Sequence, residues 1–137
     1  MSYTTTYTQG EHSVTTMTAK RLEARCTAEI VQWIREFLGL TYKQVGQITG
    51  TTTRTAQRWG NPTELSVPAE PHRARLQQLR EVQRLLGVVF TEPSEGHDWL
   101  FSAVPALHGQ RPIDLIRGGD VAAVTGILAG LHAGTFG

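Results

Sequence analysis

The sequence has little cysteine, no long apolar run and no strand-like alternation, and each absence narrows what the protein can be. Its single cysteine, Cys26, excludes an internal disulfide and fits a reducing compartment. No apolar stretch approaches the roughly 20 residues that a membrane-spanning helix needs. The N-terminal MSYTTTYTQGEHS lacks the basic and apolar regions of a secretory signal. These absences predict a cytoplasmic protein with no role in a membrane.

Signatures of catalysis and of metal binding are also missing. None of the five histidines is paired with a second ligand at helical spacing, and no CxxC motif occurs. His97 and Asp98 are adjacent, but no motif places a nucleophile near them, so we expect them to cap a loop. Gly118 and Gly119 lack the preceding strand and the Lys-Ser/Thr of a phosphate-binding loop. We therefore expect a protein that is not an enzyme and binds no metal or cofactor.

Hydrophobic residues recur at helical spacing, which predicts an all-α fold. Residues 1–19, rich in Thr, Ser and Gly, are expected to form a flexible arm. The first amphipathic helix is expected at residues 27–38 and the longest at residues 70–90. The longest helix has an apolar seam that fits either the core of one chain or a dimer contact. Three or four shorter helices are expected after it, three of them at residues 98–104, 112–117 and 121–132.

The stretch LTYKQVGQITGTTTRTAQRWG, residues 40–60, predicts two short helices joined by a tight turn. Thr41 and Gln44 match a capping box at the start of the first helix. Gly50 supplies the positive φ that the turn requires, and Thr52 can cap the second helix. Such a pair after an amphipathic helix is typical of a helix-turn-helix, and this stretch resembles the Xre/Cro repressor class.

The second of these helices carries the side chains that a DNA-reading helix needs. Arginine can bind guanine and glutamine can bind adenine through paired hydrogen bonds, while cationic groups and helix N-termini hold phosphates. The predicted DNA contacts are Lys43, Gln44, Thr52, Thr53, Arg54, Gln57 and Arg58. The alternative is an ordinary helical hairpin whose polar face is only solvated. Residues 1–60 carry a net charge of +3, which favours DNA contact without requiring it.

The C-terminal part contains a second pattern, built from Trp99-Leu100, Pro105, Arg111-Pro112-Ile113-Asp114-Leu115-Ile116 and a closing GTFG. This order resembles the toxin-binding domain of the Xre/MbcA/ParS antitoxins, whose partners are RES-domain toxins. Ala106 departs from the pattern, because an Asn often follows the proline there. Together with the helix-turn-helix, the resemblance covers roughly residues 27–137.

The resemblance implies an antitoxin of a type II toxin–antitoxin system with two partners. One is a cognate RES-domain toxin, which degrades NAD or transfers ADP-ribose from it, and the other is operator DNA of its own operon. A homodimer within a hetero-oligomeric complex is implied as well. The implied toxin contacts are Trp99, Arg111, Pro112, Leu115, Arg117, Gly134, Thr135, Phe136 and Gly137, of which the last four form a tail that enters the NAD pocket.

The sequence therefore divides into a flexible arm (1–19), a helix-turn-helix DNA-binding region (20–66), a long connecting or dimerisation helix (67–92) and a toxin-binding domain with a neutralising tail (93–137). The alternative is a stand-alone transcription regulator in which the C-terminal part serves only for dimerisation. A neighbouring reading frame with a RES domain would favour the antitoxin.

Overall fold

The structure, a computed structural model, describes the backbone of residues 9–134 and the side chains of residues 18–134. This part of the chain contains only helices and connecting segments, which confirms the all-α prediction. None of these helices is long and apolar enough to cross a lipid bilayer. The helices are α1 (Gln9–Glu36), α2 (Tyr42–Thr49), α3 (Thr53–Trp59), α4 (His72–Val89), α5 (Pro93–Leu100), α6 (Pro112–Arg117) and α7 (Val121–His132), with short 3-10 helices η1 (Pro62–Glu64) and η2 (Pro105–Leu107).

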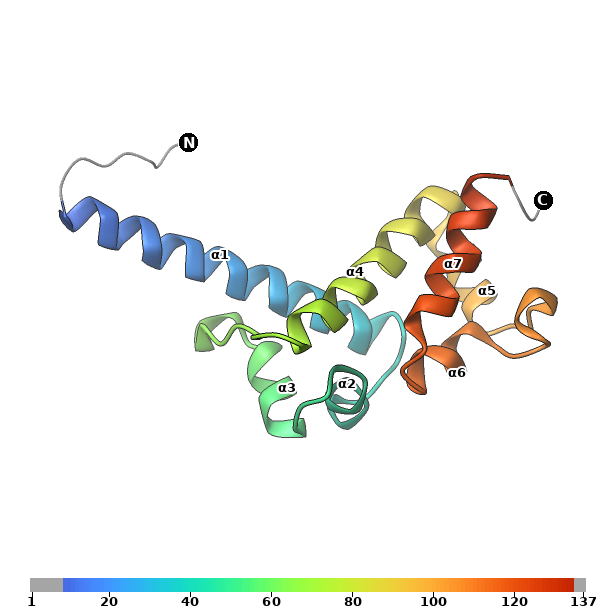
Figure 1. Ribbon diagram of the computed structural model, residues 1–137, viewed down its shortest axis with the longest axis horizontal. Coiled ribbons are helices and arrows are strands. Elements are labelled where there is room, and N and C mark those ends of the chain that lie inside the picture. Colours follow the sequence, from blue (N-terminus) through green and yellow to red (C-terminus); the bar gives the residue numbers. More distant parts are fainter. Residues whose placement is uncertain (1–8, 135–137) are drawn as a thin grey trace.

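The hydrophobic core lies where α4 meets its neighbours. Figure 1 shows α4 and α7 side by side, with α5 and α6 against one flank of the pair and α2 and α3 near the start of α4. Leu76, Leu79 and Leu86 of α4 are buried inside this single chain. The apolar seam of α4 is therefore part of the core of this chain, the first of the two alternatives, and a dimerisation role for the helix stays a prediction.

The first helix differs most from its prediction. It begins at Gln9 and not at Thr27, so residues 9–19 are helical where a flexible arm was expected. Strong helix formers such as Lys20, Leu22 and Ala24 extend a helix cheaply once it has nucleated in the packed part. The N-terminal part of α1 consequently projects beyond the rest of the molecule (Figure 1). Residues 1–8 lie outside the described part of the chain.

Two other predicted boundaries were also wrong. Helix α4 begins at His72 and is shorter than α1, so it is not the longest helix. Helix α5 begins at Pro93, which occupies its first turn, while the expected start was residue 98. Glu95 fixes that start because its Oε1 accepts a hydrogen bond from the Glu92 backbone N–H at 3.1 Å. The bounds of α6 and α7 were predicted correctly.

Candidate functional sites

The two short helices α2 and α3 are held by the caps that the sequence predicts. Thr41 Oγ1 accepts a hydrogen bond from the Gln44 N–H at 3.1 Å, and Gln44 Oε1 accepts one from the Thr41 N–H at 2.8 Å. Gly50 ends α2 with φ at +85°. Thr52 Oγ1 accepts from the Thr55 N–H at 3.1 Å and so starts α3. The two predicted short helices and the turn between them are therefore present.

The outward face of α3 is polar and cationic. Arg54, Gln57 and Arg58 are exposed, as are Thr52 and Thr53, whereas Ala56 and Trp59 are buried. Arg58 Nε lies 3.8 Å from Glu64 Oε1 of η1, an exposed and therefore weak ion pair. The helix can thus present two guanidinium groups and an amide to a groove without disturbing the core.

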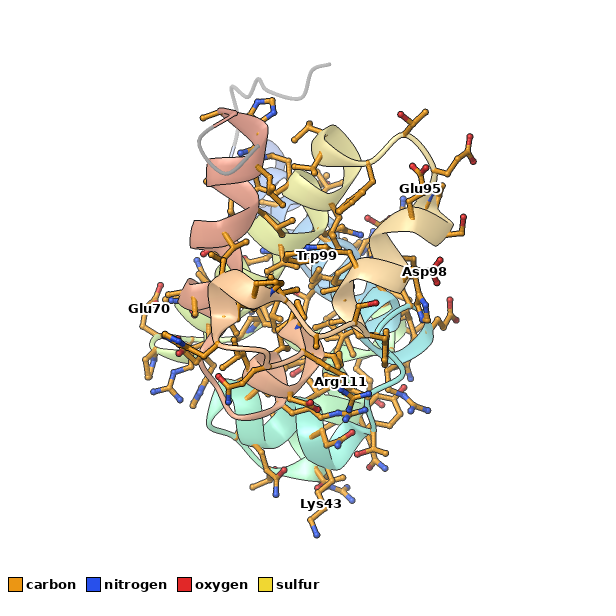
Figure 2. The ribbon with its side chains drawn as sticks, turned by 90° about the vertical axis from the view of Figure 1, so that its right-hand side faces the viewer. Lys43, Glu70, Glu95, Asp98, Trp99 and Arg111 are labelled. Atoms are coloured by element: carbon orange, nitrogen blue, oxygen red, sulfur yellow. The ribbon has the colours of Figure 1, made fainter. Side chains whose placement is uncertain are left out.

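Two residues of α2 were predicted to contact DNA, Lys43 and Gln44, and they differ in how far their polar groups are already hydrogen-bonded. Lys43 is exposed, and its ammonium group points away from the protein (Figure 2). Both the backbone N–H and the side-chain oxygen of Gln44 are used in the α2 cap. Only the side-chain NH2 group of Gln44 remains for a phosphate, which limits the contact predicted for this residue.

Helix α3 is anchored to α1 by an amide that the sequence analysis missed. Gln32 Nε2 donates to the Gly60 carbonyl at 3.1 Å and lies 3.3 Å from the Tyr42 hydroxyl. The Arg35 guanidinium lies 4.3 Å from the centre of the Tyr42 ring, an attractive cation–π arrangement. No local sequence signal marks such a contact, because it joins residues 28 positions apart. It fixes the C-terminal end of the exposed helix.

A second anchor joins α4 to the helix pair. His72 Nδ1 lies 2.8 Å from the Thr49 carbonyl oxygen at the end of α2. The imidazole ring also packs against Trp59, with 6.1 Å between ring centres. This histidine therefore links α4 to both α2 and α3, and its position was not predicted from the sequence.

On the C-terminal surface, the carboxylate of Asp114 binds two arginine side chains. Asp114 accepts two hydrogen bonds from Arg111, at 2.8 and 2.9 Å, and a third from Arg117 at 3.3 Å. The hydrogen bonds from Arg111 are the chief reason why the pKa of Asp114 lies below its ordinary value, and both guanidinium charges add to the effect. Two arginines expected to face a toxin are thus held in fixed orientations by an exposed neighbour on α6.

The other predicted toxin contacts differ in their exposure. Trp99 and Leu115 are half-buried, and the Trp99 ring lies 6.0 Å from the ring of Phe90. Trp99 comes from α5, and in the view of Figure 2 it lies above Arg111 with Asp98 to its right. Pro112 is buried in the first turn of α6, so its side chain lies inside the fold and not on this surface.

The tail is described only at its first residue. Gly134 is exposed and has φ of +79°, a conformation that glycine adopts without strain, directly after α7. Thr135, Phe136 and Gly137 lie outside the described part of the chain. Their predicted insertion into a toxin pocket stays a prediction.

His97 does not cap a loop as expected, because it lies within α5. Its ring stacks on Phe101, with 4.5 Å between ring centres, and forms an edge-to-face pair with Phe37, which directly follows α1, with 5.4 Å between ring centres. Phe37 in turn stacks on Trp33 at 5.4 Å. This row of aromatic rings joins α1 to the C-terminal helices. Within the described part of the chain, no three His, Cys, Asp or Glu residues gather as metal ligands would.

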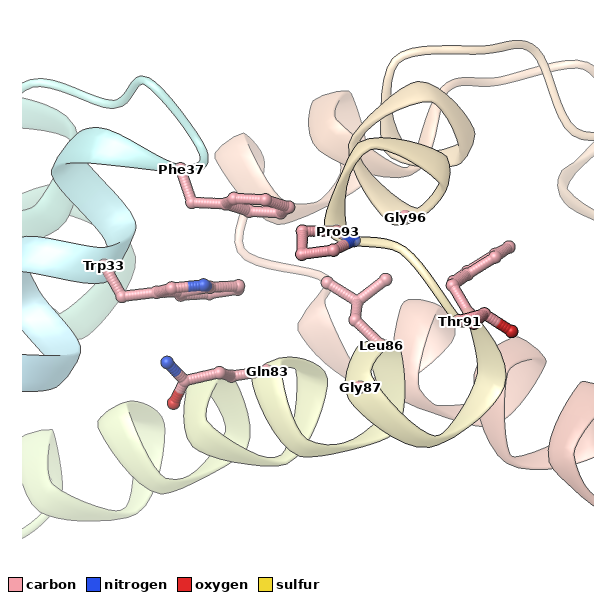
Figure 3. Close-up of a pocket in the computed structure, with 9 residues that line it drawn as sticks. Trp33, Phe37, Gln83, Leu86, Gly87, Thr91, Pro93 and Gly96 are labelled. Carbon is pink, nitrogen blue, oxygen red and sulfur yellow. The ribbon is translucent and has the colours of Figure 1, made fainter.

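An open hollow of about 380 Å³ lies beside these rings, between α1, α4 and α5 (Figure 3). Its walls are largely apolar, and Gln83 projects into it as a polar side chain. Gly96 packs closely against α4 and its end, since a Cβ there would lie in contact with side-chain atoms of Leu86 and Phe90, at 3.4 Å. No sequence pattern predicted this hollow, since three separate helices form it.

Comparison with known proteins shows the family to which this chain belongs. The chain is 31% identical over 109 residues to the mycobacterial cidal antitoxin MbcA of Mycobacterium bovis and of Mycobacterium tuberculosis, and the match covers 80% of this chain and 94% of the relative. The crystal structure of the M. tuberculosis MbcT–MbcA toxin–antitoxin complex contains a similar chain, with a TM-score of 0.54 and 31% identity over 80% of this chain and 96% of that one. No family model matches the sequence.

The helical fold and this identity define an antitoxin of a toxin–antitoxin system. More particularly, the chain belongs to the family of the MbcA antitoxins. The prediction that it is not an enzyme is confirmed by that membership.

Proposed function

We propose that this antitoxin neutralises a cognate toxin by binding it directly through the surface of α5, α6 and the end of α7. The observation that carries the proposal is the 31% identity to a chain solved as part of a toxin–antitoxin complex. The half-buried Trp99 and the two arginines bound to Asp114 at the ends of α6 support it, because partly exposed aromatic and arginine side chains are the usual anchors of protein interfaces.

The toxin is an NAD-consuming enzyme of the RES class, and the tail from Gly134 to Gly137 enters its NAD pocket. The family resemblance supports this step, together with the chemistry of the tail. A terminal carboxylate resembles a phosphate oxygen, and the Phe136 ring has the flat shape of a base or of nicotinamide. The exposed glycine at the start of the tail lets the chain leave α7 toward a partner.

The helix pair α2–α3 binds operator DNA, so that the antitoxin represses its own operon in the cytoplasm. The exposed Arg54, Gln57 and Arg58 support this part of the proposal, because arginine and glutamine can form paired hydrogen bonds with base edges in the major groove. A single seven-residue helix makes few contacts, so we infer that tight binding uses a dimer on two half-sites.

Binding to the toxin is tested by co-expression with the reading frame next to the antitoxin gene, followed by affinity purification. We expect a stable complex, and we expect Trp99→Ala to weaken it by at least tenfold, which corresponds to about 1.4 kcal/mol. The matched control is Trp33→Ala, which removes an indole from α1, away from α6. If the two variants bind as tightly as each other and as the wild type, Trp99 is not part of the interface.

A further inference from the structure

We propose that Arg21 and Arg25, on the projecting part of α1, contact backbone phosphates of the DNA beside the bases that α3 reads. This inference rests on the DNA-binding part of the proposed function and extends it. Residues on α1 were not among the DNA contacts expected from the sequence.

The two arginines lie on the same face of α1. They are four positions apart, which places them one helical turn from each other, and both are exposed. Together with Pro62, Thr63 and Leu65, they line an open hollow of about 420 Å³. Both side chains therefore border η1 and the segment that follows it.

This side of the molecule is continuous with the exposed helix. Helix η1 follows α3 directly, and Glu64 of η1 lies 3.8 Å from Arg58 of α3. Gln32 of α1 holds the end of α3 through the Gly60 carbonyl. In Figure 1 the projecting part of α1 extends over the side of α3 on which η1 lies. A duplex that contacts the exposed face of α3 therefore meets this part of α1 next.

The charges on this part of α1 suit an anion. Glu23 is held by Arg73 of α4, with Oε2 2.8 Å from Nη2, and Glu64 is paired with Arg58. Glu29 is the remaining acidic neighbour, one turn from Arg25. Among the residues whose side chains are described, neither Arg21 nor Arg25 forms an ion pair. Their guanidinium groups are thus free for phosphate oxygens, which they bind well.

The proposed contacts would also increase the affinity for DNA. Phosphate contacts supply most of the affinity of DNA-binding proteins, while base contacts supply specificity. The exposed face of α3 offers two guanidinium groups, and Lys43 adds one ammonium group. Two further arginines on a rigid helix would raise affinity without changing which bases are read.

The test compares wild-type protein with Arg21→Ala/Arg25→Ala on a labelled duplex from the promoter of the antitoxin's own operon. Affinity is measured by fluorescence polarisation at several salt concentrations, beside a duplex of scrambled sequence. The matched control is Arg80→Ala/Arg84→Ala on α4, which removes the same charge at the same four-residue spacing. Circular dichroism must show that the helix content of both variants equals that of the wild type.

We expect the α1 variant to bind both duplexes about tenfold more weakly at low salt and to keep its preference for the promoter. The slope of log affinity against log salt should become shallower by about two, because each phosphate contact contributes about 0.9. The α4 control should keep the wild-type slope. An α1 variant with the wild-type slope and affinity would overturn the inference.

The same experiment separates this inference from the function on which it rests. If wild-type protein does not prefer the promoter duplex, the DNA-binding function and the α1 contact fall together. If wild type prefers it and Arg54→Ala/Arg58→Ala abolishes the preference, while the α1 variant is unchanged, only the α1 contact is wrong. Loss of toxin binding by the α1 variant with unchanged DNA binding would instead make this surface a protein interface and also overturn the inference.

Discussion

Gly46 and Thr51 approach so closely that a Cβ built on Gly46 would lie 2.8 Å from the Thr51 carbonyl oxygen. The glycine lies in the middle of α2, and the carbonyl belongs to the turn that leads into α3. Real Cβ atoms do not come this near to backbone, so any side chain at position 46 must push the turn away. This close approach sets the orientation of α3 relative to α2.

Gly46→Ala should therefore destabilise the protein, although alanine is the better helix former. We expect a loss of about 1–3 kcal/mol in the free energy of unfolding, the usual effect of forcing an extra methyl group into a packed site. Urea denaturation followed by circular dichroism measures it. Gly126→Ala is the control, because position 126 of α7 has no atom within 4 Å of the added Cβ. That substitution should stabilise the protein by up to about 1 kcal/mol; equal effects of the two changes would contradict the packing argument.

Removing the cap of α3 should weaken the helix that carries the predicted base contacts. Thr52→Ala deletes the oxygen that accepts from the Thr55 N–H, and loss of an N-cap costs about 1 kcal/mol. Thr53→Ala, one position later and exposed, keeps the cap and should have little effect on the free energy of unfolding. Thr52→Ser should restore most of the loss. A Thr52→Ala protein as stable as Thr53→Ala would show that the cap contributes nothing.

The exposed arginines of α3 should matter for DNA binding and not for folding. Arg54→Ala and Arg58→Ala should each reduce affinity for the promoter duplex. A base contact is worth about 1–3 kcal/mol and its loss relaxes the preference at one position, whereas loss of a phosphate contact weakens binding to all sequences alike. Binding to a set of duplexes with single base changes distinguishes these results. Wild-type affinity in both variants would exclude α3 as the reading helix.

The carboxylate of Asp114 should contribute to stability in a pH-dependent way. Its pKa in the folded protein is lowered, chiefly by hydrogen bonds from Arg111. Stabilisation by a group with a depressed pKa is complete above the pKa of the unfolded chain, about 3.9, and is lost as pH falls through the lower folded value. Asp114→Asn should therefore lower the urea midpoint at pH 7, and the difference from wild type should shrink below about pH 4.

Salt provides the control for this prediction. Because Asp114 is exposed, high salt should reduce the difference at pH 7 by screening the charges. A difference that stays constant from pH 7 to pH 3 would mean that the carboxylate acts through shape and not through charge.

The sequence predicted local structure best where caps and glycines are decisive. Thr41, Gly50, Thr52 and Asp120 each fix a helix end through bonds to residues within a few positions, so the pattern alone locates α2, α3 and α7. The start of α1 was missed because threonine-rich segments have low helix propensity, whereas helix extension depends on the nucleus that follows.

The contacts that position the candidate sites were harder to predict. Gln32 bonds to Gly60 across 28 positions, and His72 to Thr49 across 23, and neither pair has a signature in the sequence. Arg111 and Asp114 are close in sequence, but their two hydrogen bonds depend on how the side chains are oriented at the start of α6. The predicted toxin contacts at the tail depended on family resemblance, and no local pattern supports them.

Blockage of the toxin's NAD pocket by the C-terminal tail can be measured as the rate at which the purified toxin consumes NAD in the presence of saturating antitoxin. The full chain should suppress consumption, whereas a chain ending at Ala133 should still bind the toxin yet leave NAD consumption near the rate of free toxin. Full suppression by the shortened chain, at equal occupancy, would contradict the claim.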